Sequence, residues 1–186
     1  MGLVRSLAKS VLNRVARAVG KNDLFEKPGE RQHQPKLPIE EEGEEPEPAR
    51  IRAADLKALQ AAISEGGRPL LVHHWATWCD PCEEELPMVE ELARAGVSVL
   101  GISWDRFQDF RGIDQVVASV AEYTQAKGLS WPTLVADAQP EALFEGLGLE
   151  FQKVPQSRLL GPEGVLLQVD GVLGPEQLDA IRRLSS

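Results

Sequence analysis

The sequence predicts an α/β domain in which a mixed β-sheet lies between two layers of helices, and three observations support this three-layer α/β/α fold. From residue 53 onward, short apolar runs alternate with segments whose apolar residues recur every three or four positions. Such alternation of strands and helices favours right-handed crossovers and a parallel sheet. Two further strand-like runs near the C-terminus flank a Gly-Pro-Glu-Gly turn, which adds antiparallel strands.

The overall composition excludes several classes of protein. The chain has 186 residues, 42% of them hydrophobic, which corresponds to one domain with additional chain. No apolar run reaches the roughly 18 residues that a membrane-spanning helix needs. Two cysteines are too few for a disulfide-dense scaffold. The net charge of −9 argues against a nucleic-acid partner, because such proteins normally carry a basic surface.

Residues 1–21 form a basic segment with a net charge of +5 and no acidic residue. Within it, the apolar residues of 3–19 fall near one helical face, which predicts a basic amphipathic helix. This helix could make a peripheral contact with an anionic membrane surface, or it could be a frayed arm or dock on its own domain. Charged residues interrupt every candidate apolar core of a secretory signal, so the default expectation is a cytoplasmic location.

Residues 22–52 are expected to form an extended, acidic, proline-rich linker. Between residues 22 and 48, nine acidic residues outnumber three basic ones, and five prolines interrupt the chain. A segment with so few apolar residues cannot bury enough surface to offset the entropy lost on ordering. The folded domain is therefore predicted over residues 53–186, which contain both cysteines and all four tryptophans.

The first half of the domain contains two predicted helices and two predicted strands. Apolar residues at helical spacing predict a helix that begins near Leu56 and ends at Gly66. Residues 69–75 are a short, largely apolar strand candidate. A second helix begins near Cys79 and ends before residues 97–104, which are expected to form a buried strand.

The second half of the domain begins with a third helix. Residues 113–120 carry apolar side chains at positions i, i+3, i+4 and i+7, which is the pattern of one helical face. The remaining elements are expected at 132–136 (strand), 141–145 (helix), 156–160 and 165–170 (strands), and 175–184 (helix).

The strongest motif is Cys79-Asp80-Pro81-Cys82, which follows a predicted strand and opens a predicted helix. Pro81 suits the first helical turn. The unpaired N–H groups and the dipole at a helix start stabilise an anion, so Cys79 is expected to be a nucleophilic thiolate. Cys82, one turn further along the helix, is placed to attack a mixed disulfide formed at Cys79. A CxxC motif near a βαβ pattern therefore indicates thiol–disulfide exchange.

Different interpretations of the two cysteines remain open at this point. A structural zinc site normally needs four ligands, and the sequence has no second CxxC and no histidine pair with ligand spacing. His73 and His74 would point to opposite faces of a strand, so at most one could join the cysteines. No metal is therefore expected. The pair could also be two inert cysteines, or it could contain a peroxidatic cysteine that does not require Cys82.

The motif and its flanking residues resemble the thioredoxin superfamily, specifically its TlpA/ResA-like branch of protein disulfide reductases. The matching positions are Trp75, Ala76, Trp78, Cys79, Pro81, Cys82, Glu85 and Pro87. The resemblance covers roughly residues 53–184 and implies a thioredoxin fold with an extra central strand–helix insertion. It also implies that Val154-Pro155 is a cis-proline dipeptide that packs against the CxxC motif, beside which a bound substrate pairs as an added strand.

The resemblance suggests further residues that support the site. Trp78 would shield the cysteines. His73 stands where the family places a buried acid or amide, and it could accept the Cys82 proton or be a core histidine. Glu85 matches an acidic residue near the family's active site, and it could shuttle protons or simply complement the helix dipole. The residues that flank Val154-Pro155 depart from the family pattern, which leaves the substrate preference open.

Acidic side chains crowd the start of the predicted active-site helix. They are Asp80, Glu83, Glu84 and Glu85. Like charges disfavour a thiolate and oppose the effect of the helix N-terminus. We therefore predict a fairly reducing dithiol/disulfide couple.

The function implied by the resemblance is that of a thiol–disulfide oxidoreductase that reduces disulfides in a protein partner. Cys79 would attack, Cys82 would resolve the mixed disulfide, and Val154 with Pro155 would position the partner. The cysteine pair would serve in place of a cofactor, and an upstream thiol reductant would recharge it. The alternatives are a thioredoxin-fold adaptor or redox sensor, and a peroxiredoxin-like peroxidase, whose usual threonine is replaced here by Ala76.

Overall fold

The computed structural model describes residues 51–149 and 153–186. The predicted basic helix at 3–19 and the predicted linker up to residue 50 lie outside the described residues. The described elements are β1 (Ile51–Ala54), α2 (Leu56–Glu65), β2 (Leu70–Trp75), α3 (Asp80–Arg94), β3 (Ser98–Ser103), the 3₁₀ helix η1 (Asp105–Phe107), α4 (Ile113–Lys127), β4 (Thr133–Ala136), α5 (Pro140–Gly146), β5 (Gln156–Gly161), β6 (Gly164–Asp170) and α6 (Pro175–Leu184).

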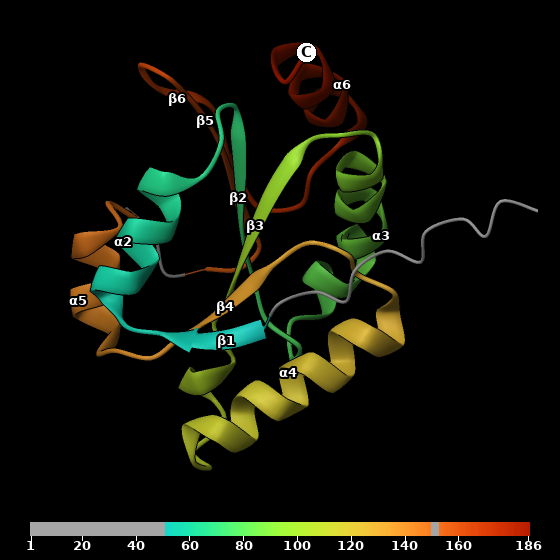
Figure 1. Ribbon diagram of the computed structural model, residues 1–186. Coiled ribbons are helices and arrows are strands. Elements are labelled where there is room, and N and C mark those ends of the chain that lie inside the picture. The colour runs from blue at the N-terminus through green and yellow to red at the C-terminus, as the bar shows by residue number, and fades with distance from the viewer. Residues whose placement is uncertain (1–50, 150–152) are drawn as a thin grey trace, which may run out of the picture. The chain divides into compact units, whose positions relative to one another are not determined.

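The strands form one mixed sheet in the order β1-β4-β3-β2-β5-β6 (Figure 1). The strands β1, β4, β3 and β2 run parallel to one another, whereas β5 is antiparallel to both β2 and β6. The predicted parallel sheet with a closing antiparallel hairpin is therefore confirmed. The carboxyl ends of β2 and β3 lie at the same edge of the sheet, because the two strands are parallel. Residues that follow these strands can therefore meet there.

Helices cover both faces of the sheet, as the three-layer prediction requires. Helix α2 contacts α5, and α3 contacts α6 (Figure 1). Right-handed crossovers place α3 and α4 on the same face, and the ring contact between Trp75 of β2 and Tyr123 of α4 agrees with this. Because successive strand residues alternate, His73 and Trp75 face the α3/α4/α6 layer, whereas His74 faces the α2/α5 layer.

Two elements were not predicted from the sequence, namely β1 and η1. Strand β1 begins at Ile51, so it starts inside the predicted linker rather than at residue 53. Only Ala54 is buried in this strand, and Arg52 interrupts its apolar residues. The strand is defined by its parallel pairing with β4 at the edge of the sheet. Its sequence lacks the alternation that would reveal it.

The centre of the sheet is buried on both faces. Every residue of β2 is buried, which is typical of a central strand covered by helices on both sides. Trp104 and Trp131 are also buried. The two histidines of β2 therefore lie in the core, one on each side of the sheet.

Candidate active site

The two cysteines form a disulfide at the start of α3, with an Sγ–Sγ distance of 2.08 Å. Cys79 is the N-cap residue of this helix, and its Sγ accepts the Cys82 N–H at 3.2 Å. When the pair is reduced, the same N–H and the helix N-terminus favour a thiolate at Cys79. Cys79 keeps 5% of its surface exposed, whereas Cys82 is fully buried. Cys79 is therefore the sulfur that a partner can reach.

The local sequence explains why the helix starts at this point. Asp80 is the first helical residue, and Pro81 occupies the first turn, where its missing N–H breaks no intrahelical hydrogen bond. Asp80 and Glu83 also place negative charge near the positive end of the helix dipole. The predicted start near Cys79 is thus confirmed.

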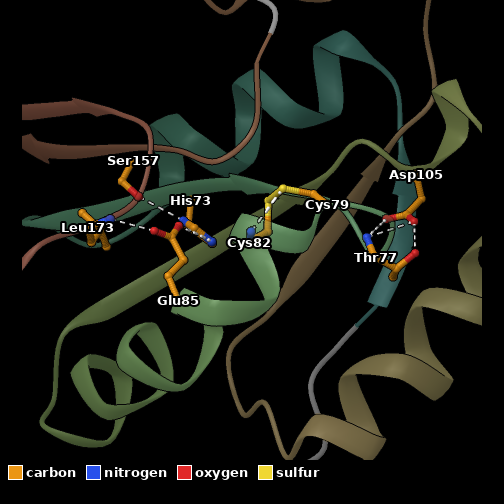
Figure 2. The surroundings of a disulfide bond; sticks show 8 residues. All are labelled: His73, Thr77, Cys79, Cys82, Glu85, Asp105, Ser157 and Leu173. Atoms are coloured by element: carbon orange, nitrogen blue, oxygen red, sulfur yellow. Dashed lines mark hydrogen bonds and ion pairs between the residues drawn. A yellow bond between two sulfur atoms is a disulfide. The ribbon is translucent and has the colours of Figure 1, made fainter.

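A buried carboxylate fixes the loop that precedes Cys79. Asp105 is 4% exposed and lies directly after Trp104, at the carboxyl end of β3. It accepts the Thr77 N–H at 3.2 Å, the Thr77 hydroxyl, and the Ser103 hydroxyl at 2.7 Å (Figure 2). These bonds tie the segment between Trp75 and Cys79 to the neighbouring strand. Asp105 is therefore a positioning residue for the motif.

Replacing Asp105 by alanine is expected to lower the free energy of unfolding by about 3 kcal/mol, because three donors lose a charged acceptor. The midpoint of urea unfolding measures this loss. Asp179→Asn is the matched control, since Asp179 is exposed and its ion pair with Arg182 contributes less than about 1 kcal/mol. Equal midpoints for the two variants would show that Asp105 does not hold the loop.

A buried polar cluster lies on the α3/α4/α6 side of the sheet. His73 Nδ1 is 3.0 Å from the Ser157 Oγ, and His73 Nε2 is 3.4 Å from Glu85 Oε1. The other oxygen of Glu85 accepts the Leu173 N–H at 2.7 Å. Figure 2 shows this cluster and the Asp105–Thr77 pair with the disulfide drawn between them. His73 and Glu85 are both fully buried, so Glu85 is not a solvent-exposed partner of the helix dipole.

Burial moves the pKa values of Glu85 and His73 in opposite directions. Desolvation raises the pKa of Glu85 from 4.5 to about 7, although the Leu173 N–H opposes this shift. Desolvation lowers the pKa of His73 to about 3, so its ring is neutral at physiological pH. Glu85 lies one helical turn from Cys82 on α3. At neutral pH Glu85 can therefore gain or lose a proton, whereas the His73 ring stays neutral.

His74 has a different environment from His73. Its Nδ1 accepts the Trp104 Nε1–H at 3.2 Å on the α2/α5 side of the sheet. Burial lowers the pKa of His74 to about 3, with smaller contributions from His73 and Arg158. His74 is thus a neutral core residue that holds the Trp104 ring, in line with the opposite orientation predicted for the two histidines.

The negative charge around the motif is smaller than the sequence suggests. Glu83 forms an ion pair with Lys127 of α4, and Glu85 is buried. Of the four acidic residues, only Asp80 and Glu84 lie at the surface without an ion pair among the described residues. The negative charges that disfavour a Cys79 thiolate are therefore mainly those of Asp80 and Glu84.

The Val154–Pro155 peptide bond is cis, which is the geometry that the resemblance implies. Pro155 is buried and leads directly into β5. Val154 lines two cavities, one of about 330 Å³ shared with Pro155 and one of about 210 Å³ shared with Trp78. Trp78 is 40% exposed. A second cis bond, Arg68–Pro69, precedes β2 and was not predicted.

Three polar residues of the site were not predicted from the sequence, namely Ser157, Thr77 and Asp105. Ser157 meets His73 because the two residues are register partners in the β2–β5 pairing, and a register cannot be read from the sequence. Asp105 could have been placed at the site from its position in the sequence. An acidic residue directly after a buried parallel strand lies at the sheet edge where the CxxC loop also begins.

Fold and site together define a class of protein, that of thioredoxin-fold domains with a dithiol/disulfide pair at a helix start. The chain belongs to the Redoxin family, whose sequence model matches residues 43–182. It is 30% identical to the thiol-disulfide oxidoreductase ResA of Geobacillus kaustophilus over 94 residues, which is 48% of each chain. It is 26% identical to the thiol:disulfide interchange protein DsbE of Yersinia pestis, over 59% of this chain and 52% of that protein. The chain thus spans about half the length of these curated relatives, and they support the TlpA/ResA-like branch.

Solved structures support the fold. The thioredoxin-related protein from Neisseria meningitidis serogroup B superposes with a TM-score of 0.52 at 21% identity, over 66% of this chain and 89% of that chain. A thiol-disulfide isomerase from Corynebacterium glutamicum gives a TM-score of 0.50 at 17% identity, over 63% of this chain and 80% of that chain. The thioredoxin fold predicted from the motif is therefore confirmed.

Neither a membrane-crossing helix nor a metal-binding cluster is found in the part of the chain that the structure describes. No helix within 51–149 and 153–186 combines the length and the apolar character that crossing a membrane would need. The same residues contain no group of three or more histidine, cysteine, aspartate or glutamate side chains arranged to hold a metal ion.

Proposed function

We propose that this protein is a thiol–disulfide oxidoreductase that reduces disulfide bonds in a protein partner. The observation that carries the proposal is the Cys79–Cys82 disulfide at the start of α3, in which only Cys79 is accessible. The similarity to ResA and DsbE, which are named for thiol–disulfide chemistry, supports it.

The proposed reaction transfers two electrons from the cysteine pair to the substrate. The Cys79 thiolate attacks one sulfur of the substrate disulfide, and the other substrate sulfur leaves as a thiolate that takes up a proton. Cys82 then loses its proton and attacks Cys79 Sγ. This step forms the Cys79–Cys82 disulfide and releases the second substrate thiolate, which is also protonated. An external dithiol must then reduce the protein by the reverse exchange.

Glu85 is proposed to accept the Cys82 proton in the second step. Because Cys82 and the Glu85 carboxylate are both buried and lie one helical turn apart, ionising the thiol without a proton acceptor would create an uncompensated buried charge. His73 is proposed as a positioning residue, since its neutral ring lies between Ser157 and the carboxylate of Glu85. Val154 and Pro155 are proposed to align the substrate chain beside the disulfide.

The reaction is tested by the turbidity assay of insulin reduction with dithiothreitol as the electron donor. The wild-type protein is expected to accelerate insulin reduction, and Cys79→Ser is expected to abolish the acceleration while keeping the folded circular dichroism spectrum. Glu91→Gln is the matched control, because Glu91 is exposed near the other end of the same helix. No acceleration by the wild type, together with no reversible Cys79–Cys82 disulfide in a redox titration, would end the proposal.

An adaptor function would give a different result in the double variant Cys79→Ser/Cys82→Ser. An adaptor would keep its partner and its cellular phenotype in this variant, whereas a reductase would lose the phenotype. The comparisons do not favour the adaptor, because the relatives are named for thiol–disulfide chemistry.

The couple is predicted to be reducing, with a midpoint potential below about −200 mV, toward the value of about −270 mV known for thioredoxin. The exposed charges of Asp80 and Glu84 disfavour the Cys79 thiolate and so destabilise the reduced form that donates electrons. Equilibration with dithiothreitol buffers of known ratio measures the potential. A value near −120 mV, which is typical of strongly oxidising dithiol/disulfide couples, would contradict the prediction that this couple is reducing.

We also propose that residues 3–19 contact an anionic membrane surface and that the protein acts in the cytoplasm. The five basic residues of segment 1–21 support the membrane contact, since each contributes about 1 kcal/mol near such a surface. A peptide of residues 1–21 is expected to bind phosphatidylserine vesicles at low salt and to dissociate at high salt. Binding that does not depend on salt would contradict the electrostatic contact.

A further inference from the structure

A cavity of about 210 Å³ next to the disulfide has no role in the reaction described above. Its lining is mainly aromatic and aliphatic and includes Trp78, Trp104, Phe107, Phe144, Leu149 and Val154. Lys153 and Gln156, which flank Val154-Pro155, add polar side chains to the lining. Phe144 comes from α5 and Phe107 from η1, so the insertion between β3 and β5 supplies part of the wall. The cavity therefore combines active-site residues with residues of the inserted segment.

The aromatic wall of this cavity is assembled before any partner binds. The Trp104 ring is stacked between Phe107 and Phe144, with ring centroids 5.2 Å and 5.0 Å apart and interplanar angles of 28° and 5°. The Trp104 indole N–H is satisfied by His74 Nδ1 at 3.2 Å. No donor of this ring is left for a polar ligand, and the ring cannot turn without losing the bond and both stacks. The wall thus offers rigid, uncharged aromatic surface.

The cavity is continuous with the place where a substrate chain must lie. Trp78 directly precedes the attacking Cys79, and Val154 directly precedes the cis-proline Pro155, and both line the cavity. A substrate whose cysteine is joined to Cys79 and whose backbone lies beside Pro155 must therefore pass the cavity. Side chains near the attacked cysteine can enter it.

We propose that this cavity receives one aromatic side chain of the substrate protein, close in sequence to the cysteine that Cys79 attacks, and thereby selects the substrate. The proposal rests on the proposed disulfide reductase function. An aromatic ring fits the chemistry of the wall, because rings pack favourably edge-to-face or offset against other rings and bury a large apolar area. A charged side chain would lose its hydration there without gaining a partner on the Trp104 wall.

The position of the cavity allows its role to be separated from the chemistry of the cysteines. His74 and Phe144 place it on the α2/α5 side of the sheet, whereas His73 and Glu85 lie on the α3/α4/α6 side. A change at Phe144 should therefore alter substrate choice without changing the proton transfer at Glu85. Small disulfides that cannot reach the cavity report on the chemistry alone.

The test is a phenylalanine scan of a peptide substrate, carried out with the full-length reduced protein. Six disulfide-linked peptides carry one phenylalanine at each of the three positions before and after the attacked cysteine, in an otherwise Ser/Ala/Gly sequence. At one position, phenylalanine is expected to raise kcat/KM about tenfold over the all-Ser/Ala/Gly peptide, which corresponds to about 1.4 kcal/mol. Phe144→Ala is expected to remove this gain and to leave the rate with 2-hydroxyethyl disulfide unchanged.

Phe110→Ala is the matched control, because Phe110 is 87% exposed and does not line the cavity. This variant should keep the tenfold gain. If Phe144→Ala unfolds the domain, Phe144→Leu keeps an apolar side chain without the ring and is expected to reduce the gain to about threefold or less. A gain that is the same in wild type and in the folded Phe144 variant, or the absence of a preferred position, would overturn the proposal.

Failure of the cavity proposal is distinct from failure of the proposed function. A wild-type protein that reduces all seven peptides at one rate is a disulfide reductase without this pocket. A wild-type protein that reduces neither the peptides nor 2-hydroxyethyl disulfide contradicts the reductase function itself.

Discussion

Cys82→Ser is expected to stop the reaction at a mixed disulfide between Cys79 and the substrate, and to lower steady-state turnover by about a thousandfold or more. The reason is that the serine hydroxyl cannot attack the Cys79 sulfur, so the covalent complex has no internal route to release. The complex should persist in non-reducing gels and disappear when dithiothreitol is added. Mass spectrometry of the trapped adduct identifies both the substrate and the cysteine that was attacked.

The double variant Cys79→Ser/Cys82→Ser is the control for this trap, since it removes the attacking thiol as well and should capture nothing. An adduct on Cys82 in the variant Cys79→Ser, at the same yield, would mean that the two cysteines have exchanged roles. That outcome would contradict the assignment made from exposure, because Cys82 is fully buried and Cys79 is not.

Glu85→Gln is expected to stabilise the domain at high pH by about 3 kcal/mol and to slow turnover about 100-fold at neutral pH. Burial raises the pKa of Glu85 from 4.5 to about 7. Below pH 4.5 the carboxyl group is protonated in both the folded and the unfolded chain, so the replacement changes little. As the pH rises from 4.5 through 7, the unfolded chain ionises first and the wild type loses stability relative to the variant. Above pH 7 the free energy of unfolding of the variant exceeds that of the wild type by the full amount.

Urea unfolding at pH 4, 6 and 8 measures the change in stability, and the pH profile of kcat/KM measures the change in rate. The wild-type profile should rise with an apparent pKa near 7, and this rise should be absent in Glu85→Gln. Glu91→Gln is the control, because Glu91 is exposed near the other end of the same helix and should leave both profiles nearly unchanged. A purely structural role of Glu85 would alter stability without moving the rate profile.

Much of the fold could be predicted from the sequence because its central elements have strong apolar patterns. The strands of the sheet centre are largely apolar. Helix α6 was predicted with its observed bounds, since Pro175 suits the first helical turn. Strand β1 was not predicted, because an edge strand buries only one of its four residues and gains its identity from pairing with β4. Tertiary pairing of this kind leaves no local trace in the sequence.

The candidate site was predictable where its chemistry is local and not where it depends on packing. The roles proposed for Cys79 and Cys82 follow from their spacing at a helix start. The sequence alone could not decide between His73 and Glu85 as the base, because their proton affinities depend on how completely each is buried. Ser157 could not be found at all, since it reaches His73 only through the register of β5 against β2.

Successive side chains of β2 point to opposite faces of the sheet, and this separates the two tasks proposed for the domain. One side chain of this strand, His73, belongs to the layer that holds Glu85, and its neighbour His74 supports the aromatic layer next to Val154. Substitutions in one layer can therefore accumulate with little effect on the other. The proposed substrate preference and the redox chemistry of the Cys79–Cys82 pair can therefore be altered by substitutions on opposite faces of one strand.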